Sequence, residues 1–367
     1  MKIDFANLAK AHEEYQSEID EAIKRVLGRA CFIMGEEVAL FEEELKHFIG
    51  SKHAITCSSG TSAILLALLG SGIGRGDEVI TTPFSFIAAA EMIALIGAKP
   101  VFVDIDPDTF HIDTAQIPAH ITPKTKAIIP VSLFGLPADM ETINAIAKAH
   151  NLIVIEDGAQ SFGATSTNQA GVCKKSPHHS GLGVTSFFPA KPLGCYGDGG
   201  AVFCDDDRLA DKIRALRIHG QSRRYQHAHI GINARLDSLQ AAILRVKLKH
   251  YPAQISRRQK VAKLYEKYLA NKPLARQKIP KNTQSVYAQY AILSPHRDKL
   301  EKNLTAHHIP YAIHYPKPLH LQDCFAYLGY QAGDFEVCER VAKQILSLPM
   351  NPYLSEEEIA FICECVI

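Results

Sequence analysis

The chain has 367 residues, 47% hydrophobic and 22% charged, which is enough length for a large core and two domains. Its formal net charge of +1 argues against general binding to nucleic acid or to a membrane surface. No apolar run reaches the roughly 20 residues that a membrane-spanning helix needs, and the acidic N-terminal stretch does not resemble a secretion signal.

Short apolar runs alternate with helical patterns between about residues 50 and 205. The expected strands are residues 54–57, 79–82, 101–104, 127–133 and 152–155. The expected helices between them are residues 61–69, 86–96 and 139–150. This alternation predicts an α/β domain with a mainly parallel central sheet. Because the expected strands are nearly all apolar, we expect both faces of the sheet to be covered.

The pattern changes after residue 250. A charged helix over residues 253–270 leads into a stretch rich in Pro, Asn and Lys. An alternating segment follows at residues 286–293. Three helices are then expected, at residues 297–308, 335–345 and 355–366. Ser355 and Glu358 have the spacing of a capping box for the last helix. We therefore expect a large domain over residues 1–250, with a helical N-terminal segment, and a smaller α+β domain over residues 251–367.

Lys191 stands out in the stretch Ser186-Phe-Phe-Pro-Ala-Lys-Pro-Leu-Gly-Cys-Tyr-Gly-Asp-Gly-Gly200. An amine in apolar surroundings loses its proton more easily, because desolvation disfavours the ammonium form. A neutral amine can attack an aldehyde and form a Schiff base, which makes pyridoxal phosphate the first cofactor to consider. The alternative is a surface lysine in a β-hairpin.

The segment Ser58-Ser-Gly-Thr-Ser-Ala63 lies between an expected strand and an expected helix. Small residues allow backbone N–H groups to approach an anion, and a helix N-terminus carries partial positive charge. Thr61 and Ser62 add hydroxyl donors, so the segment is a candidate phosphate site. The alternative is an ordinary Ser or Thr cap of the helix.

Three residues are candidates for holding the ring of such a cofactor. Asp157 follows a buried strand at the edge where α/β sheets bind ligands, and its carboxylate can keep a pyridine nitrogen protonated. Gln160 is near enough in sequence to reach the substituents of the ring. Phe86 begins an expected helix and has a face that stacks on a ring. The alternatives are an aspartate that caps a turn and a phenylalanine of the core.

Asn233 and Arg235 precede a strongly apolar helix and either cap it or serve an active site. The glycines between residues 70 and 76 lack the spacing of a dinucleotide-binding loop, and neither a Walker A motif nor a His-Glu-x-x-His motif occurs. A dinucleotide-binding loop and a Walker A site are therefore excluded.

Nine cysteines are scattered along the chain without paired spacing, which predicts free thiols in a reducing cytoplasm. Cys173, His178 and His179 come closest to a metal-ligating group. Their spacing fits no site that we can name, so we expect no metal.

Taken together, these motifs resemble those of the DegT-type nucleotide-sugar aminotransferases, a group of fold type I pyridoxal-phosphate enzymes. The resemblance covers nearly the whole chain. Its motifs are Gly35-Glu-Glu-Val-Ala-Leu-Phe-Glu42, Ser59-Gly-Thr-Ser62, Glu156-Asp-Gly-Ala-Gln-Ser-Phe-Gly163, Ser186-Phe-Phe-Pro-Ala-Lys191, Asn233-Ala-Arg-Leu-Asp-Ser-Leu-Gln-Ala-Ala242 and His314-Tyr-Pro-Lys-Pro-Leu-His320. The resemblance implies pyridoxal phosphate as the cofactor and a fold type I large domain.

The matched motifs also imply roles for residues around the ring. Lys191 corresponds to the lysine that forms the Schiff base, and Asp157 to the acid that pairs with the ring nitrogen. Gln160 corresponds to the residue near the ring hydroxyl, and Phe86 occupies the ring-stacking position. Some relatives have histidine at the lysine position and act as dehydratases, so the lysine in this chain favours transamination.

Other matched residues are implied to bind the phosphate of the cofactor. Thr61, Ser62 and Ser186 correspond to phosphate contacts within one subunit. Asn233 corresponds to a phosphate ligand that the other subunit supplies. The resemblance therefore implies a homodimer with shared active sites.

Three stretches are most similar to family members that aminate UDP-2-acetamido-2-deoxy-3-oxo-glucuronate, namely residues 219–225, 233–235 and 313–316. Arg235, His314 and Tyr315 would supply charge-assisted hydrogen bonds to the uronate carboxylate. The implied reaction uses L-glutamate as amino donor and yields a 3-amino sugar for surface polysaccharide such as lipopolysaccharide. The segment 171–181 looks longer than the usual connection, so it is a candidate for altering the choice of substrate.

Two other functions remain open at the level of the sequence. One is amination of another UDP- or dTDP-linked keto sugar, such as a 4-keto-6-deoxy sugar. The other is a non-catalytic sensor of pyridoxal phosphate or a sugar nucleotide, because a fold alone does not fix a function.

Overall fold

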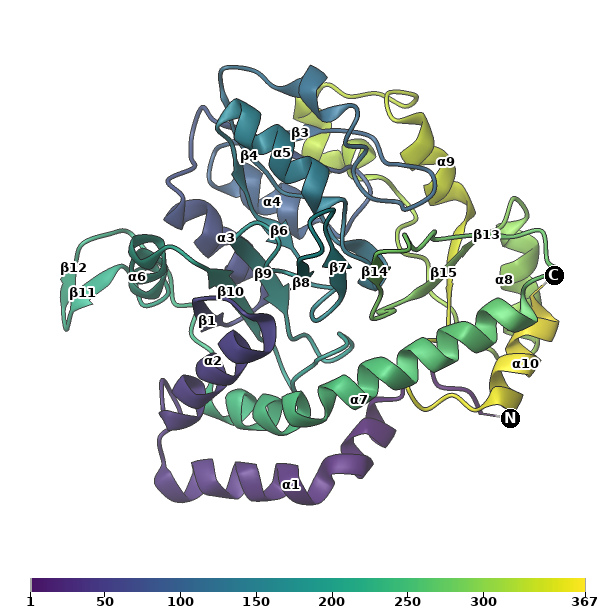
Figure 1. Cartoon of the computed structure of the whole chain (residues 1–367), viewed down its shortest axis with the longest axis horizontal. Helices are drawn as coiled ribbons and strands as arrows, with labels where there is room; N and C mark the ends of the chain where they lie inside the picture. The colour runs from purple at the N-terminus through teal and green to yellow at the C-terminus, as the bar shows by residue number, and fades with distance from the viewer. Residues whose placement is uncertain (1, 367) are drawn as a thin grey trace.

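The computed structural model describes residues 2–366 and is built around a central β-sheet (Figure 1). Two four-stranded sheets, ordered β1-β10-β9-β6 and β3-β2-β4-β5, meet in the segment 153–157, which contributes β5 to one and β6 to the other. Only β10 runs antiparallel to its neighbours, and the other strand pairs are parallel. The predicted mainly parallel sheet is thus confirmed. Its strands are β1 (His53–Cys57), β2 (Glu78–Thr81), β3 (Lys99–Phe102), β4 (Thr125–Ile128), β5 (Ile153–Val154), β6 (Glu156–Asp157), β9 (Leu182–Ser186) and β10 (Gly200–Cys204).

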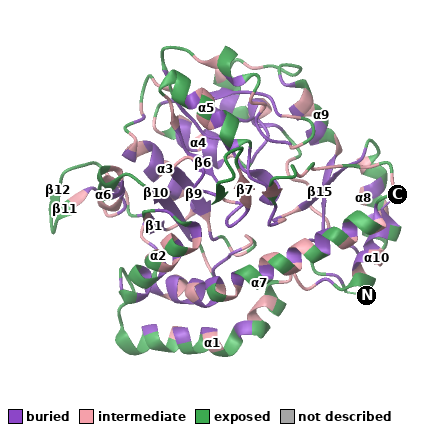
Figure 2. Cartoon of the chain, in the orientation of Figure 1, coloured by how far each residue is buried: buried purple, intermediate pink, exposed green. Residues whose placement is uncertain are grey.

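Helices cover both faces of this sheet, as the apolar strands predict. Side chains alternate along each strand, so that Ile55 and Val79 face one side while Ala54 and Ile80 face the other. The first side packs against α3 (Gly60–Gly70), α4 (Ala88–Leu95) and α6 (Asp207–Leu216). The second packs against α2 (Glu36–Ile49), α5 (Met140–His150) and α7 (Ser238–Tyr268). Figure 2 shows the strands buried at the centre, with the exposed helix faces outside.

Helix α7 joins the sheet to the C-terminal part of the chain. We expected an apolar helix after Arg235 and a separate charged helix from residue 253, but the structure has one helix of 31 residues that contains Pro252. It crosses the predicted domain boundary between residues 250 and 251, and Ile3 packs into the C-terminal core. The division into domains stays a prediction.

The C-terminal part combines a small antiparallel sheet with helices. The sheet has the order β13-β15-β16, and one further sheet, β14-β7-β8, links this part to a hairpin of the large domain. Ser355 and Glu358 form the expected capping box. The elements are β7 (Thr165–Thr167), β8 (Cys173–Lys175), β13 (Ala275–Arg276), β14 (Thr283–Gln284), β15 (Tyr290–Leu293), α8 (Arg297–Ala306), α9 (Glu336–Gln344), β16 (Ile345–Leu348) and α10 (Glu356–Cys365).

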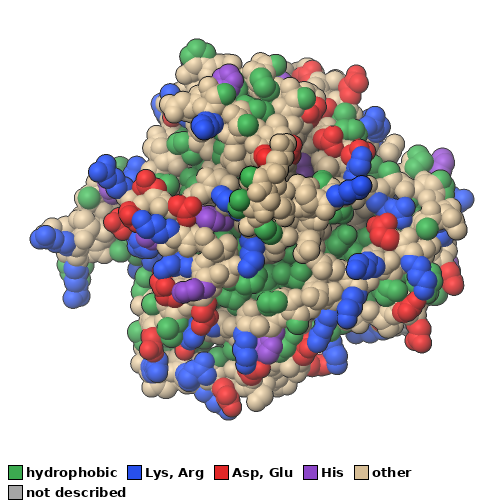
Figure 3. All heavy atoms as spheres, viewed as in Figure 1, with side chains coloured by type: hydrophobic (Ala, Val, Ile, Leu, Met, Phe, Trp, Pro, Cys, Tyr) green, Lys and Arg blue, Asp and Glu red, His purple; other side chains and the backbone are tan. Residues whose placement is uncertain are grey.

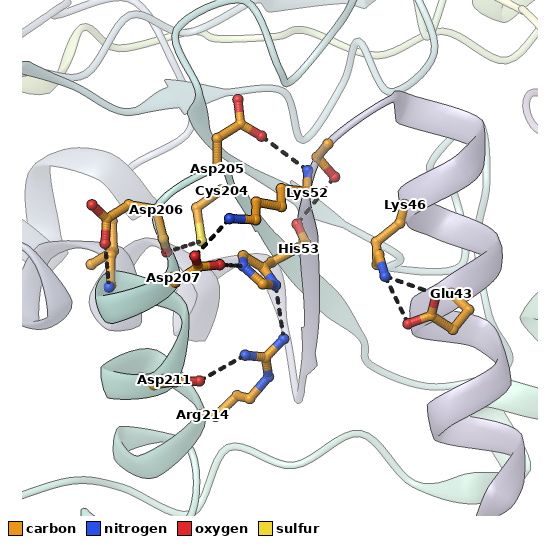
Figure 4. Close-up of polar contacts among 12 residues, drawn as sticks. Glu43, Lys46, Lys52, His53, Cys204, Asp205, Asp206, Asp207, Asp211 and Arg214 are labelled. Carbon is orange, nitrogen blue, oxygen red and sulfur yellow. Dashed lines mark hydrogen bonds and ion pairs between the residues drawn. The ribbon is translucent and has the colours of Figure 1, made fainter.

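Polar contacts fix the edge strand β1 to the start of α6 (Figure 4). Lys52 Nζ lies 2.6 Å from one oxygen of Asp207, and His53 Nε2 lies 2.7 Å from the other. Arg214 contacts the second nitrogen of the same imidazole at 3.2 Å. The sheet edge is thereby fastened to the helix that follows β10.

Two elements extend away from this body. Helix α1 (Leu8–Arg29) packs along the first half of α7, and β11 (Gln221–Arg223) with β12 (Gln226–His227) forms a projecting hairpin (Figure 1). The basic side chains of Arg223 and Arg224 belong to that hairpin, whereas charges of both signs are interspersed over the rest of the visible face (Figure 3). Among residues 2–366, no helix is both long and apolar enough to cross a bilayer.

Candidate active site

Lys191 lies in the loop between the antiparallel strands β9 and β10. The loop is held by the core, because Phe187 and Leu193 are buried against α2 and α7. The Lys191 N–H donates to the Phe188 carbonyl at 2.8 Å, which closes a turn at the lysine. Burial lowers the pKa of the Lys191 amine, although the charge of Asp157 opposes this effect. The lysine therefore occupies a hairpin loop, yet it is not the solvated surface residue of the alternative interpretation.

Asp157 ends β6 and faces the lysine loop. Its carboxyl is buried, with 6% of the residue exposed, and accepts a hydrogen bond of 3.0 Å from the Ala159 N–H. Burial raises the pKa of Asp157, while the Ala159 N–H and the Lys191 charge lower it. The neighbouring Glu156 points to the other side of the strand, where it lies 2.9 Å from His179 Nδ1. Alternation along β6 thus leaves Asp157 as the carboxylate of the site.

Gln160 connects the site to the C-terminal part of the chain. Its side-chain oxygen accepts from the Phe134 N–H at 2.7 Å, and its side-chain nitrogen donates to the Tyr315 hydroxyl at 3.1 Å. The Tyr315 ring lies 6.4 Å from the exposed ring of Phe86. His314 Nδ1 is 3.0 Å from Ser347 Oγ, and burial, with a smaller contribution from Lys191, lowers the pKa of His314 to about 4. The structure thus brings the predicted ring contacts and two predicted substrate contacts together.

The predicted phosphate contacts meet where α3 approaches β9 and β10. The Ser59 hydroxyl caps α3 by accepting from the Ser62 N–H at 3.0 Å. A Cβ at Gly60 would lie 2.7 Å from Cβ of Ser186, and a Cβ at Gly200 would collide with the backbone of Ser59. Glycine at both positions lets the first turn of α3, with Thr61 and Ser62, lie against Ser186. The first turn of α3 and the hydroxyls of Thr61, Ser62 and Ser186 therefore converge on one small region.

The segment of Asn233 and Arg235 runs beside this region. The Ser58 N–H donates to the Ala234 carbonyl at 3.0 Å, which fixes the segment next to the start of α3. Arg235 Nε is buried without a hydrogen-bond partner among the described residues, so a donor is left for a ligand. Asn233 is exposed, and no described contact joins it to Lys191 or Asp157 within this chain.

Sequence reasoning missed the backbone and side-chain groups that orient these residues. The Phe134 N–H fixes Gln160, the Ala234 carbonyl fixes the start of α3, and Ser347 contacts His314. Phe134 and Ser347 lie in no motif, and the role of Ala234 cannot be read from its motif because a backbone group leaves no trace in the identity of its residue. They lie far from their partners in sequence, so only the fold reveals them.

The segment 171–181 lies on another side of the sheet end. His178 contacts Asp205 at 2.8 Å, and His179 contacts Glu156, so both imidazoles are engaged. Val172, Lys174 and His179 line a cavity of about 650 Å³. In the described chain, neither Lys191 nor Asp157 lines that cavity.

The arrangement fits pyridoxal phosphate. A buried carboxylate can hold a ring nitrogen protonated through its negative charge, and an amine whose pKa is lowered by burial reacts with an aldehyde. Glycine at position 60 lets the start of α3 lie against Ser186, which brings Thr61, Ser62 and the helix N-terminus together as a site for a phosphate. The mainly parallel sheet, the start of α3 as a phosphate site, and the pair of Asp157 and Lys191 together define a fold type I pyridoxal-phosphate enzyme.

Comparisons with known proteins agree with this class. The model of the DegT/DnrJ/EryC1/StrS aminotransferase family matches residues 13–367, and the chain belongs to that family. It is 46% identical to the UDP-2-acetamido-2-deoxy-3-oxo-D-glucuronate aminotransferase of Pseudomonas aeruginosa, over 98% of each chain.

Solved structures share the fold over nearly the whole length. DesV of S. venezuelae, solved with a ketimine intermediate, superposes with a TM-score of 0.96 at 37% identity, covering 100% of this chain and 97% of that one. NtdA of Bacillus subtilis, solved with bound cofactor PMP, gives 0.89 at 28% identity, covering 99% and 85%. The predicted family, fold class and cofactor are confirmed, and the chain is a pyridoxal-phosphate-dependent aminotransferase.

We expect Gly60→Ala to weaken the binding of pyridoxal phosphate by about tenfold or more, because one charge-assisted phosphate contact contributes roughly 1.5–3 kcal/mol. The new methyl group would push the start of α3 away from Ser186. Fluorescence titration of the cofactor-free protein measures the affinity. Gly74→Ala is the matched control, since nothing lies within 4 Å of a Cβ there. Equal affinities of the two variants would contradict the phosphate site.

Proposed function

We propose that this protein transfers the amino group of L-glutamate to UDP-2-acetamido-2-deoxy-3-oxo-glucuronate, giving the 3-amino sugar for a surface polysaccharide. The match to the Pseudomonas aeruginosa enzyme, over 98% of both chains, carries the choice of sugar. The unpartnered Arg235 Nε supports it, because a uronate brings a carboxylate that needs a cationic donor. The free thiols of all nine cysteines support a cytoplasmic location, where sugar nucleotides are available.

The residues of the chain divide the chemistry between them. When bound, pyridoxal phosphate supplies an aldehyde for the incoming amine and a ring that accepts electrons. Lys191 Nζ, with its lowered pKa, takes the proton from the α-carbon of glutamate and later returns a proton to C3 of the sugar. The negative charge of Asp157 would keep the proton on the ring nitrogen, and its buried position strengthens that attraction. Gln160 and Phe86 would hold the ring of the cofactor in position beside Lys191.

We place the proposed sugar site next to Lys191 and Asp157. Arg235 would bind the carboxylate of the uronate, and Tyr315 would donate from its hydroxyl. Because the pKa of His314 is lowered to about 4, its imidazole is neutral near pH 7 and offers a neutral hydrogen bond. The positive charge for the carboxylate therefore comes from Arg235.

A homodimer with shared active sites is part of the proposal. Asn233 is exposed at the base of the projecting hairpin, where Ile230 is 97% exposed and Tyr225 is 79% exposed. Large apolar side chains at such exposure are typical of surfaces that a partner covers. A second copy would bring its Asn233 to the phosphate site of the first.

Replacing Lys191 by Ala should remove the near-visible absorbance of the cofactor-loaded protein and lower turnover by about 10²–10⁴-fold or more. The reason is that the only amine placed to bond the aldehyde and move the proton is lost. Absorbance spectra and single-turnover assays with L-glutamate measure both effects. Asp157→Asn is the companion variant, which should keep bound cofactor but slow proton transfer. Wild-type spectrum and rate in the Lys191→Ala protein would reject the mechanism.

Arg235→Gln should lower kcat/KM for the 3-keto uronate by about 10–100-fold, because a charge-assisted contact to the carboxylate is lost. The same 3-keto sugar with a hydroxymethyl group in place of the carboxylate is the control substrate, and its kcat/KM should change little. Equal losses for both substrates would contradict carboxylate recognition. Turnover of a 4-keto-6-deoxy sugar in preference to both would refute the proposed substrate.

Mixing the inactive Lys191→Ala and Asn233→Ala proteins should restore activity if the sites are shared. Random pairing makes half of the dimers mixed, and one of their two sites has both native residues, so about a quarter of wild-type activity is expected. The mixture is unfolded and refolded together, and turnover is compared with that of each variant treated alone. Absence of any gain, with mixed dimers demonstrated by mass spectrometry, would show that each site uses its own Asn233.

A further inference from the structure

A cavity of about 650 Å³ lies where the start of α5 meets the hairpin of β7 and β8. The loop 106–114 and the segment 278–283 of the C-terminal part complete its walls. Its volume falls within the roughly 300–1,000 Å³ that is usual for sites of small molecules. Among residues 2–366, none of those assigned above to the cofactor or the sugar lines it, so the cavity is separate from the active site.

The inner wall of this cavity is apolar. Ile112, Pro137, Ala138 and Met140 line it and are buried. Such a wall packs against the CH groups of a ligand. The polar groups around it therefore decide which kind of ligand the cavity takes.

His111 supplies a free hydrogen-bond donor. The residue lines the cavity and is 3% exposed. Its Nε2 accepts a hydrogen bond of 3.2 Å from the Leu133 N–H, and burial lowers the pKa of His111 to about 4. The neutral ring therefore carries its one proton on Nδ1, and no described residue accepts from that nitrogen. A buried donor of this kind calls for a partner with an acceptor oxygen.

The second imidazole of the wall is already engaged. His179 lies 2.9 Å from Glu156 through Nδ1 and 2.8 Å from the Ser166 hydroxyl through Nε2. Both of its ring nitrogens thus have protein partners. The donor that a ligand would meet is therefore that of His111.

Carboxylates outnumber amines around the cavity. Five carboxylates line it together with two amines, those of Lys174 and Lys278. Lys278 lies 3.1 Å from Asp108, whereas the other four carboxylates form no ion pair within residues 2–366. Asp139 and Glu141, at the start of α5, accept only from backbone N–H groups. The excess of negative charge favours a cationic ligand. The five carboxylates belong to Asp106, Asp108, Asp113, Asp139 and Glu141.

The spread of these charges distinguishes between kinds of cation. In the part of the chain that the structure describes, no three carboxylates, imidazoles or thiols gather as the ligands of a metal ion do. Separated carboxylates suit an organic cation, whose charge and polar atoms are also spread out. Because nucleotide sugars and other phosphates are anions, the same excess of carboxylates disfavours them.

We propose that this cavity binds a hydroxylated organic amine without phosphate, of which an amino sugar is the simplest kind. Its ammonium group would lie among the carboxylates at the start of α5, and one of its hydroxyl oxygens would accept from the His111 Nδ1–H. An ammonium group alone has no acceptor for that donor, so the ligand needs an oxygen as well. The apolar wall would pack against the CH groups of the sugar ring. This site is independent of the sugar that the enzyme aminates, so either proposal can fail without the other.

Titration calorimetry of the cofactor-loaded protein tests the chemistry of the ligand. D-glucosamine, charged at about pH 6.5, should bind with a Kd on the order of 1 mM, as expected for about a dozen heavy atoms. N-acetyl-D-glucosamine has the same ring without the charge, and putrescine has the charge without hydroxyls, so both should bind at least about fivefold more weakly. Equal affinity for either one would contradict the proposal. The near-visible absorbance should stay unchanged, and a change that follows glucosamine binding would place the amine at the cofactor instead.

A charge-neutralising variant tests the place of binding. Asp139→Asn with Glu141→Gln should weaken glucosamine binding by about tenfold, because two carboxylates lose their charge. Asparagine keeps an oxygen that caps α5, so the helix start is retained. Asp298→Asn with Glu357→Gln is the matched control, since it makes the same changes at the exposed starts of α8 and α10. Equal losses in the two double variants would refute the site.

A crystal soaked with glucosamine gives a readout that needs no variant. Density for the sugar should appear in the cavity, with a hydroxyl oxygen within about 3.5 Å of His111 Nδ1. Should the double variant at the start of α5 fail to fold, this experiment decides alone. An empty cavity at glucosamine concentrations well above the measured Kd, or sugar bound only elsewhere, would overturn the proposal.

Discussion

The burial of two opposite charges, Asp157 and Lys191, is the constraint on which the site depends. Burial disfavours the charged form of each group, which raises the pKa of Asp157 and lowers the pKa of Lys191. Their mutual attraction offsets only part of this cost, so the surrounding fold must hold both in place. The carboxylate is fixed by a central strand, whereas the amine is fixed by a loop whose ends belong to antiparallel β9 and β10. The antiparallel direction of β10 in the central sheet thus has a functional consequence, because it lets the lysine loop fold back over the end of the sheet.

Much of this could be predicted from the sequence because the signals are local. Apolar runs indicated the strands, and their alternation with helical patterns indicated a parallel sheet covered on both faces. The position of Asp157 directly after an apolar run was enough to place it at the binding edge of the sheet. The order of motifs along the chain then specified the family, the cofactor and the pairing of Lys191 with Asp157.

The remaining features depend on contacts between distant residues. The helix expected to begin at residue 253 is the second half of one longer helix, because packing of α7 against α1, α2 and α10 carries it through Pro252. The tight meeting of Gly60 with Ser186 joins residues far apart in sequence, so the glycine alone reads as part of an ordinary cap. The histidines of the segment 171–181 prove to be partners of Asp205 and Glu156, and their cavity lies apart from the cofactor residues.

Helix α7 connects these observations. Its start follows Arg235, its middle supports the lysine loop, where the Lys247 amine donates to the Gly194 carbonyl, and its end lies in the C-terminal core. One continuous helix therefore connects the segment of Arg235, the lysine loop and the C-terminal core. Farther along the same helix, Arg258 donates to the carbonyls of Tyr287 and Met350, so α7 also fixes two segments of the C-terminal part in place.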